Sequence, residues 1–324
     1  MEKLKPAKKK ILLMGKSGSG KSSMRSIIFS NVVAKDVRRL GATIDVEHAQ
    51  FKFLGNLILN LWDCGGQDAF TETYLTSQKS HVFSDVGVMI YVFDTESRHF
   101  TGRGDGGADM SVYKEIIDAL ASYSPSAHVF CLIHKMDLVP SDRRQEFQDM
   151  KEGLIEKFTP KEFRGRGRMR VYGTSIWDQT LYAAWGDIVQ CLTPNLKLME
   201  NYLRKLAQAT RAEEIVLFER ATFLRVVNIT TEVGEENPYS DRFERLSNLI
   251  KTFKHSLQGY TGQNSSHPFG EFTISCPRFN LVLSRLTNNT YVLVVLPPGE
   301  TDLVNTRLNI MGVRDGLVEL ERPG

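Results

Sequence analysis

The chain has 324 residues, of which 41% are hydrophobic and 24% charged, as in soluble proteins with one large or two ordinary domains. Its formal net charge is +3 and its basic residues are scattered, so we expect no nucleic-acid partner. No stretch approaches the ~18 apolar residues that span a membrane, and we recognise no signal peptide or lipidation motif, so we expect no direct membrane insertion. Two of the four cysteines lie in apolar runs and none has metal-type spacing, which suits reduced thiols in the cytoplasm.

The first motif along the chain is GKSGSGKS at residues 15–22, which matches G-x-x-x-x-G-K-[ST]. It lies between an apolar run at 11–14, predicted to be a strand, and a segment at 23–29 with helical spacing. Backbone N–H groups of such a loop and the N-terminus of the next helix form a concave phosphate site. Lys21 is expected to contact the β- and γ-phosphates, and the Ser22 hydroxyl to ligate magnesium. The residues expected to bind the nucleotide here are Ser17, Gly18, Ser19, Gly20, Lys21, Ser22 and Ser23.

Strands and helices alternate after this loop. Two alternating runs joined at Gly55-Asn56 predict an antiparallel pair, and a glycine-rich segment at 100–110 predicts a flexible surface loop. This alternation favours an open, mostly parallel sheet with helices on both faces, whose ligand lies outside the carboxyl ends of the strands. The predicted strands are residues 11–14, 46–54, 57–62, 86–94, 129–133 and 169–172, and the predicted helices are 23–29, 112–120, 143–158 and 182–192.

Polar residues that suit triphosphate hydrolysis follow the third strand. Asp63 suits a carboxylate that holds magnesium through water, and the N–H of Gly66 could reach a γ-phosphate. Gln67 would orient the attacking water. Thr43 is the only threonine between the phosphate loop and Asp63, and we expect it to be a second hydroxyl on magnesium, ordered when a γ-phosphate is present. Together with Lys21, Gln67 and Thr43 are therefore the expected catalytic residues.

A base-binding cluster is predicted after the strands at 129–133 and 169–172. Asp137 could accept two hydrogen bonds from the edge of guanine, which adenine cannot donate, while the stem of Lys135 lies along the base. His134 precedes this pair, and Ser175 with the adjacent backbone of Ile176 would complete the pocket. The expected ligands are therefore GTP or GDP and magnesium.

Beyond about residue 194 the pattern changes to helix, two strands, helix, three strands and helix, which predicts a compact α+β unit without a catalytic constellation. Within it, apolar residues of the helix at 243–257 follow a strict heptad seam, which is compatible with core packing or with a partner helix. The unit reads as a binding module. Its predicted elements are residues 196–206, 215–218, 222–229, 243–257, 270–274, 279–286, 290–296 and 303–320.

These motifs resemble the Ras-like small GTPases and, among them, the RagA/RagB branch of the Rag GTPases. The stretches that carry the resemblance are residues 15–29, 40–47, 59–67, 134–139, 174–178, 217–224 and 288–292. The resemblance implies a P-loop GTPase (G) domain at 1–193 and a roadblock-type dimerisation domain at 194–324, through which the chain pairs with a RagC/RagD-like subunit.

The resemblance also implies a biological setting. Rag heterodimers signal amino-acid sufficiency to the target-of-rapamycin kinase complex at the lysosome or vacuole, where a Ragulator- or EGO-type scaffold holds them. A cytoplasmic protein recruited by partners is consistent with the lack of a lipidation motif. A GTPase-activating protein is a further implied partner.

Two residues depart from the general small-GTPase pattern. His134 occupies the place of the usual asparagine, so nucleotide affinity is expected to be tuned differently. Ser17 occupies a loop position where Ras-like proteins usually have glycine, and its side chain would crowd the γ-phosphate and Gln67. We therefore predict slow hydrolysis that depends on a partner.

A different class of function is a scaffold that binds GTP structurally and hydrolyses it negligibly; the presence of Gln67, Thr43 and Asp63 argues against it. Only about twenty residues separate Lys21 from Thr43, which leaves no room for the helical insertion of a heterotrimeric Gα protein. An Arf-like protein would leave the C-terminal half unexplained. A small-molecule kinase would need a lid with arginines, which we cannot place.

Overall fold

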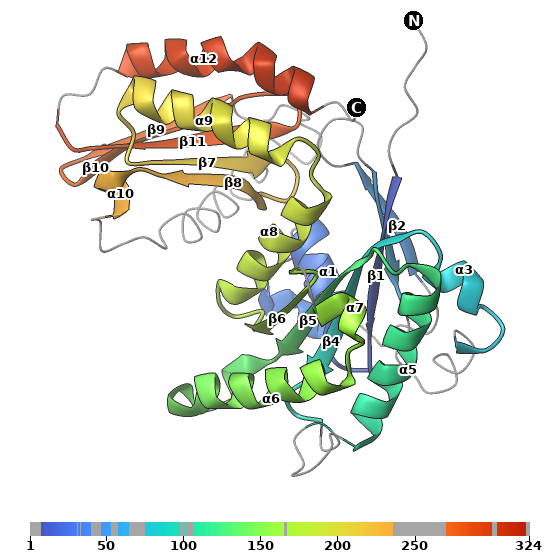
Figure 1. Ribbon diagram of the computed structural model, residues 1–324. Coiled ribbons are helices and arrows are strands. Elements are labelled where there is room, and N and C mark those ends of the chain that lie inside the picture. The colour runs from blue at the N-terminus through green and yellow to red at the C-terminus, as the bar shows by residue number, and fades with distance from the viewer. Residues whose placement is uncertain are drawn as a thin grey trace, which may run out of the picture. The chain divides into compact units, whose positions relative to one another are not determined.

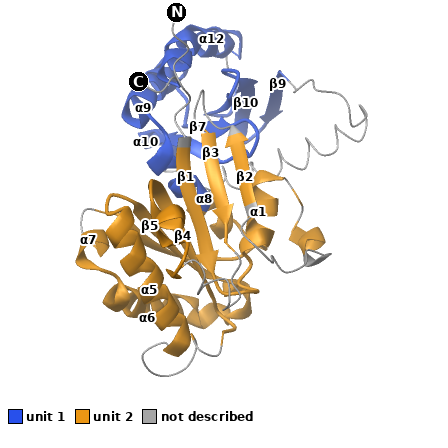
Figure 2. Ribbon diagram, turned by 90° about the vertical axis from the view of Figure 1, so that its right-hand side faces the viewer, with its two compact units in different colours: residues 1–7, 52–57, 185–324 blue, residues 8–51, 58–184 orange. Residues whose placement is uncertain are grey.

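The computed structural model describes residues 8–30, 32, 34–39, 47–52, 58–64, 75–97, 100, 107–164, 167–235, 270–299 and 303–321. The chain divides into two compact units (Figure 2). The first unit along the chain, orange and labelled unit 2 in Figure 2, comprises Lys8–Phe51 and Ile58–Ala184. The second, blue and labelled unit 1 in Figure 2, comprises Trp185–Gly324 with residues 1–7 and 52–57. The division falls inside helix α8 (Thr180–Leu192), and each unit is described by itself.

The first unit contains a six-stranded sheet of order β2-β3-β1-β4-β5-β6. β1 pairs in parallel with β3 and β4, and the β4–β5 and β5–β6 pairs are also parallel. The mostly parallel sheet predicted from the sequence is therefore confirmed, and its central strands are the near-continuous apolar runs expected of strands covered on both faces. The strands are β1 (Lys8–Gly15), β2 (Glu47–Lys52), β3 (Ile58–Asp63), β4 (Val86–Asp94), β5 (His128–His134) and β6 (Met169–Thr174).

Helices cover both faces of this sheet. In Figures 1 and 2, α5, α6 and α7 lie on one face and α1 lies on the other. In the part of the unit that the structure describes, residues 34–39, 136–138 and 141–143 form short 3-10 helices. The α-helices are α1 (Lys21–Phe29), α3 (Lys79–Phe83), α5 (Gly107–Tyr123), α6 (Arg144–Phe158), α7 (Lys161–Arg164) and α8.

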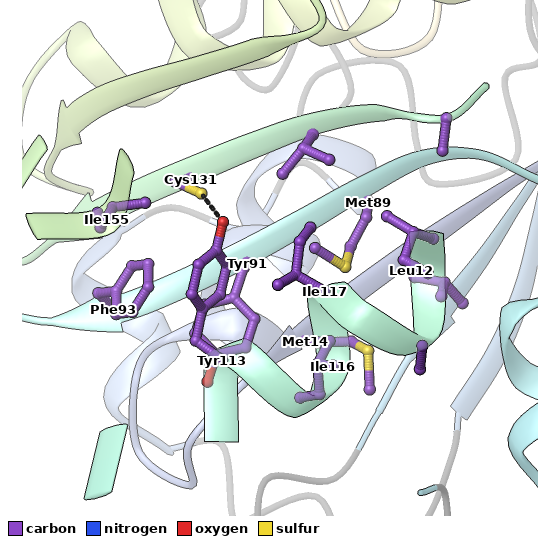
Figure 3. Close-up of a cluster of buried hydrophobic side chains, with 14 of the residues drawn as sticks. Leu12, Met14, Met89, Tyr91, Phe93, Tyr113, Ile116, Ile117, Cys131 and Ile155 are labelled. Atoms are coloured by element: carbon purple, nitrogen blue, oxygen red, sulfur yellow. Dashed lines mark hydrogen bonds between the residues drawn. The ribbon is translucent and has the colours of Figure 1, made fainter. Parts of the chain in front are cut away.

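Large apolar side chains of β1, β4, β5 and α5 form the core on the α5 face (Figure 3). Tyr113 of α5 is fully buried there, and its hydroxyl lies 2.7 Å from Thr159 Oγ1 and 3.5 Å from Cys131 Sγ. Burial raises the pKa of the Cys131 thiol to about 12. The buried hydroxyl of Tyr113 thus has hydrogen-bond partners inside the core, so its burial leaves no polar group unpaired.

The second unit is an antiparallel sheet of order β8-β7-β11-β10-β9. α9 and α12 pack against each other and cover one face of this sheet (Figure 1). An α+β unit in this half of the chain is therefore confirmed. Its elements are α9 (Leu196–Thr210), β7 (Glu214–Glu219), β8 (Arg225–Thr230), α10 (Glu232–Glu235), β9 (Glu271–Cys276), β10 (Phe279–Arg285), β11 (Thr290–Leu296) and α12 (Leu303–Leu320).

Two sequence predictions need correction. The segment 100–110 is not wholly a surface loop, because α5 begins at Gly107 and Phe100 is fully buried, with its ring 4.8 Å from that of Phe93. The strand predicted at 222–229 begins only at Arg225, because the Glu219 carboxylate accepts hydrogen bonds from the N–H groups of residues 221 and 222 and closes a turn. The predicted turn at Gly55-Asn56 and the predicted helix at 243–257 lie outside the described residues.

Within the described part of the chain, no helix combines the length and the hydropathy needed to cross a membrane.

Candidate functional site

Two glycines fix the path of the loop between β1 and α1. Gly15 has φ +141°, and a Cβ atom there would collide with the carbonyl oxygen of Val92 on the neighbouring strand β4. Gly20 has φ +95°, and a Cβ atom there would lie 2.7 Å from Cδ2 of His134. Because both positions combine left-handed backbone with close approach, only glycine is accommodated at either one. The loop is therefore held against the ends of β4 and β5.

Lys21 is enclosed by this loop. Its side chain is buried, and its Nζ donates hydrogen bonds to the carbonyl oxygens of Gly15 (2.7 Å) and Lys16 (2.8 Å). Burial lowers the pKa of Lys21 to about 8, and the nearby carboxylate of Asp63 partly opposes this shift. Since an ammonium group has three protons, two are directed to loop carbonyls and one remains for a ligand at the loop.

Ser22 and Asp63 meet beside Lys21. The Ser22 hydroxyl donates a hydrogen bond of 2.9 Å to Oδ2 of Asp63, which is fully buried at the end of β3. Arg25 Nε lies 3.5 Å from the same oxygen. A hydroxyl and a carboxylate side by side are hard oxygen donors of the kind magnesium prefers, so the residues present fit that ion. Sequence reasoning missed Arg25, although its position three residues after Ser22 on a helix is a signal that could have found it.

His134 lies at the end of β5 and is almost fully buried. Its Nδ1 is 3.0 Å from Oγ1 of Thr174 at the end of β6. Burial and the neighbouring Lys135 charge lower the pKa of His134 to about 4, so its ring is neutral near pH 7. Sequence reasoning also missed Thr174. Its position was a usable signal, because Thr174 ends β6 just as His134 ends the neighbouring strand β5.

Lys135, Asp137 and Ser175 form the rest of this cluster. Lys135 adopts a left-handed backbone (φ +68°), and its Nζ donates a 2.7 Å hydrogen bond to Oδ2 of Asp94, which the sequence analysis did not single out. The buried Ser175 donates a 2.6 Å hydrogen bond to Oδ1 of Asp137 and accepts one from the N–H of Trp177. Ile176 lies half-buried between Ser175 and Trp177. The predicted base-binding residues are thus brought together.

The remaining predicted residues fall into two groups. Ser17 and Gly18 are exposed on the loop, Ser23 is half-buried in α1, and the Ser19 hydroxyl is buried with no hydrogen-bond partner among the described residues. The second group comprises Thr43, Gly66 and Gln67, which lie outside the described residues.

Both clusters lie at one edge of the sheet. β1, β3, β5 and β6 all run in the same direction, because each pairs in parallel with a neighbour in the series β3-β1-β4-β5-β6. Their carboxyl ends carry the loop at 15–20, Asp63, His134 and Thr174. Lys21 and the Ser22–Asp63 pair thus share one edge of the sheet with His134, Asp137 and Ser175, and this is the edge outside which ligands of α/β sheets bind.

Sequence comparison identifies the family. The region described as "Gtr1/RagA G protein conserved region" matches residues 10–250. The chain belongs to the Gtr1/RagA family of G proteins. GTP-binding protein gtr1 from Schizosaccharomyces pombe is 47% identical over 310 residues, which cover 95% of this chain and 94% of that protein.

Two other relatives place the chain within this group. Ras-related GTP-binding protein B from Rattus norvegicus is 42% identical over 344 residues, covering 97% of this chain and 87% of that protein. Ras-related GTP-binding protein C from Homo sapiens is 25% identical over 241 residues, covering 71% of this chain and 56% of that protein. The RagA/RagB-like assignment made from the motifs is therefore confirmed.

Proposed function

We propose that this Gtr1/RagA family protein is a molecular switch that binds GTP and hydrolyses it slowly. The observation that carries the proposal is the shared edge of the parallel sheet, where Lys21, Ser22 and Asp63 form one cluster and His134, Asp137 and Ser175 form the other. The first cluster suits phosphates and the second suits a base. A nucleoside triphosphate is the ligand whose two ends differ in this way.

At the phosphate end, the third proton of Lys21 would bind a β- or γ-phosphate oxygen while loop carbonyls hold the other two. Ser22 would ligate magnesium directly, and Asp63 would hold it through water; Thr43 is proposed as a second hydroxyl ligand. When bound, magnesium supplies positive charge that offsets the negative charge on the phosphates. The 2.9 Å contact between Ser22 and Asp63 supports this pairing.

At the base end, Asp137 would accept two hydrogen bonds from guanine. Its Oδ1 accepts from Ser175, which fixes the carboxylate and leaves lone pairs for the base. The stem of Lys135 would lie along the base while its ammonium group pairs with Asp94. The backbone at Ile176 would complete the pocket.

Hydrolysis and switching would depend on Gly66, Gln67 and Thr43. The N–H of Gly66 would contact the γ-phosphate, and Gln67 would orient the attacking water, with Ser17 slowing the reaction by crowding this space. Ordering of the segments around Thr43 and Gln67 by the γ-phosphate would then select partners.

The alternative is a nucleotide-bound scaffold with negligible hydrolysis. A Gln67→Leu variant separates the two functions by single-turnover hydrolysis and partner capture from GTP- and GDP-loaded protein. A switch predicts slower hydrolysis in the variant and nucleotide-dependent capture by the wild type. Equal rates and equal capture in both states would favour the scaffold.

For residues 194–324 we propose a roadblock-type dimerisation domain that pairs with a RagC/RagD-like subunit. The antiparallel sheet with α9 and α12 on one face, and the more distant relative named Ras-related GTP-binding protein C, support this proposal. The heterodimer would be held at the lysosomal or vacuolar surface by a Ragulator- or EGO-type scaffold, respond to a GTPase-activating protein and signal amino-acid sufficiency to the target-of-rapamycin complex. Co-purification of a RagC-like subunit with the full chain, and its loss from residues 1–193, would test the pairing.

The experiment that decides which base is bound is the substitution Asp137→Asn. Wild type should bind GDP and GTP, whereas Asp137→Asn should lose about two orders of magnitude of guanine affinity and gain affinity for xanthine nucleotides, because an amide reverses the hydrogen-bond pattern. Calorimetry with the diphosphates and triphosphates of guanosine and xanthosine measures both changes. Unchanged guanine preference in the variant would mean that another residue recognises the base.

A further inference from the structure

Lys16, the second residue of the phosphate loop, forms an ion pair that the proposed function does not use. Its Nζ lies 2.6 Å from Oδ1 of Asp109. Asp109 is in the first turn of α5, and its side chain is 6% exposed, whereas the Lys16 side chain is 29% exposed. The ion pair therefore joins the loop to a 17-residue helix that begins far along the chain.

The same residue also contacts the phosphate-binding cation. The carbonyl oxygen of Lys16 accepts a 2.8 Å hydrogen bond from Nζ of Lys21. Lys16 thus contacts α5 through its side chain and Lys21 through its backbone. A displacement of the loop at Lys16 would therefore change both the ion pair with α5 and an acceptor of the Lys21 ammonium group.

Asp109 is itself fixed from a second direction. Its Oδ2 accepts a 2.5 Å hydrogen bond from the hydroxyl of Ser97, in the turn that follows β4. The N–H of Ser97 donates to the carbonyl oxygen of Asp94, and the Asp94 carboxylate accepts from Lys135. Asp109 therefore lies in a continuous series of polar contacts that runs from the phosphate loop to the base cluster.

We propose that Asp109 is a positioning residue that anchors the phosphate loop through Lys16 and thereby slows nucleotide release. This inference rests on the proposed function, because it concerns the retention of a guanine nucleotide at the same site. Asp109 does not contact the reacting atoms in this account. It holds the loop carbonyl that orients Lys21, and α5 thereby acts on nucleotide lifetime.

A purely structural role for Asp109 makes a different prediction. A carboxylate in the first turn of a helix is favoured by the helix dipole, so the ion pair could simply stabilise α5. In that case its removal would lower thermal stability and leave nucleotide release unchanged. The two roles are therefore separable by measuring both quantities on the same proteins.

The test is the release rate of a fluorescent GDP analogue, chased with excess GDP, from the full-length protein. Asp109→Asn and Lys16→Met should each accelerate release about tenfold, since losing a partly buried ion pair that orients a ligand-binding group is worth about 1.4 kcal/mol. The double variant should release no faster than either single variant, because both remove the same contact. Lys16→Arg should retain slow release because it keeps the charge.

The matched control is Asp118→Asn on the same helix. Asp118 pairs with Lys114 at 2.8 Å, but both side chains are about half exposed, and among the described residues neither pairs with the phosphate loop. Its release rate should equal that of the wild type. If Asp109→Asn does not fold, Lys16→Met at a more exposed position gives the same readout.

The outcomes also separate this inference from the proposed function. Binding of the analogue by the wild type, with release rates unchanged in both Lys16→Met and Asp109→Asn, would overturn the anchoring role alone. Additive acceleration in the double variant would overturn it as well, because the two residues would act independently. No binding by the wild type would overturn the proposed function and this inference with it.

Discussion

The two units both bury carboxylates, but they surround them differently. In the second unit, Glu219 is 3% exposed and accepts hydrogen bonds from the N–H of Ala221 and from the N–H and hydroxyl of Thr222, all within one turn. In the first unit, Asp63 is fully buried and contacts Ser22 and Arg25 of a helix that follows another strand.

Glu321 repeats the pattern of the second unit. Its carboxylate accepts from the hydroxyls of Thr287 and Thr290 and from the side-chain amide of Asn289, so that the end of α12 closes the turn between β10 and β11. Neutral donors of a single turn satisfy both glutamates. Glu219 and Glu321 therefore maintain turns of the second unit, whereas Asp63 joins segments of the first unit that a ligand would also contact.

The strongest test of this difference between the units is to remove Lys21, the buried cation of the first unit. Lys21→Met should weaken GDP binding about ten- to a hundredfold, since a charge-assisted hydrogen bond contributes about 1.5–3 kcal/mol. The unfolding free energy of the nucleotide-free protein should not fall, because burial already disfavours the Lys21 charge. Calorimetry and urea denaturation measure the two quantities. A large loss of stability with binding intact would reverse the assignment.

The matching substitution in the second unit removes a buried carboxylate, that of Glu219. Glu219→Ala should lower the free energy of unfolding by about 2–3 kcal/mol, because it leaves the buried N–H and hydroxyl of Thr222, and the N–H of Ala221, without their acceptor. GDP affinity should stay at the wild-type value. Denaturant titration followed by circular dichroism measures the first effect, and altered GDP affinity would show that the contrast between the units is too simple.

A third substitution sharpens the comparison within the first unit, because it changes occupied space rather than charge. Ser17→Gly should increase the single-turnover rate of GTP hydrolysis several-fold, on the order of 1 kcal/mol of barrier, by relieving crowding near the γ-phosphate. GDP affinity should change little. Fast unaided hydrolysis in the wild type that this variant leaves unchanged would contradict a slowing role for Ser17.

The smallest expected effect is the uptake of protons when GDP binds. Burial lowers the pKa of Lys21 in the free protein to about 8, and bound phosphates would raise it. Near pH 8 the binding of GDP should therefore make Lys21 take up about half a proton, and this uptake should be absent from the Lys21→Met variant. Calorimetry in buffers of different ionisation enthalpy measures the uptake. Lys10, whose pKa burial also lowers to about 8, supplies the control, because Lys10→Met should leave the uptake unchanged.

Local patterns predicted the elements of both units well, since apolar runs and helical spacing directly reflect burial. They also predicted which side chains gather at the carboxyl edge, because parallel strands bring their ends together. The prediction of a surface loop at 100–110 was wrong in part, since amino-acid composition does not reveal that Phe100 packs on Phe93.

The partners of the site residues were harder to predict. Arg25 beside Asp63, Asp94 beside Lys135 and Asp109 beside Lys16 are contacts between segments far apart in the sequence. The contacts of Arg25 and Asp109 depend on how α1 and α5 pack over the sheet, and the contact of Asp94 depends on the register between β4 and β5; short-range patterns specify neither. The sequence therefore locates a site more readily than it explains how the site is held.

The close approach of Gly20 to His134 has a consequence for sequence variation. Since a Cβ atom on Gly20 would lie 2.7 Å from the imidazole, the two positions share one volume and cannot be enlarged separately. The general small-GTPase pattern has the smaller asparagine where this chain has histidine. Because the G-x-x-x-x-G-K-[ST] pattern already places glycine at position 20, the phosphate loop leaves room for the larger imidazole of His134, and a residue with a side chain at position 20 would remove that room.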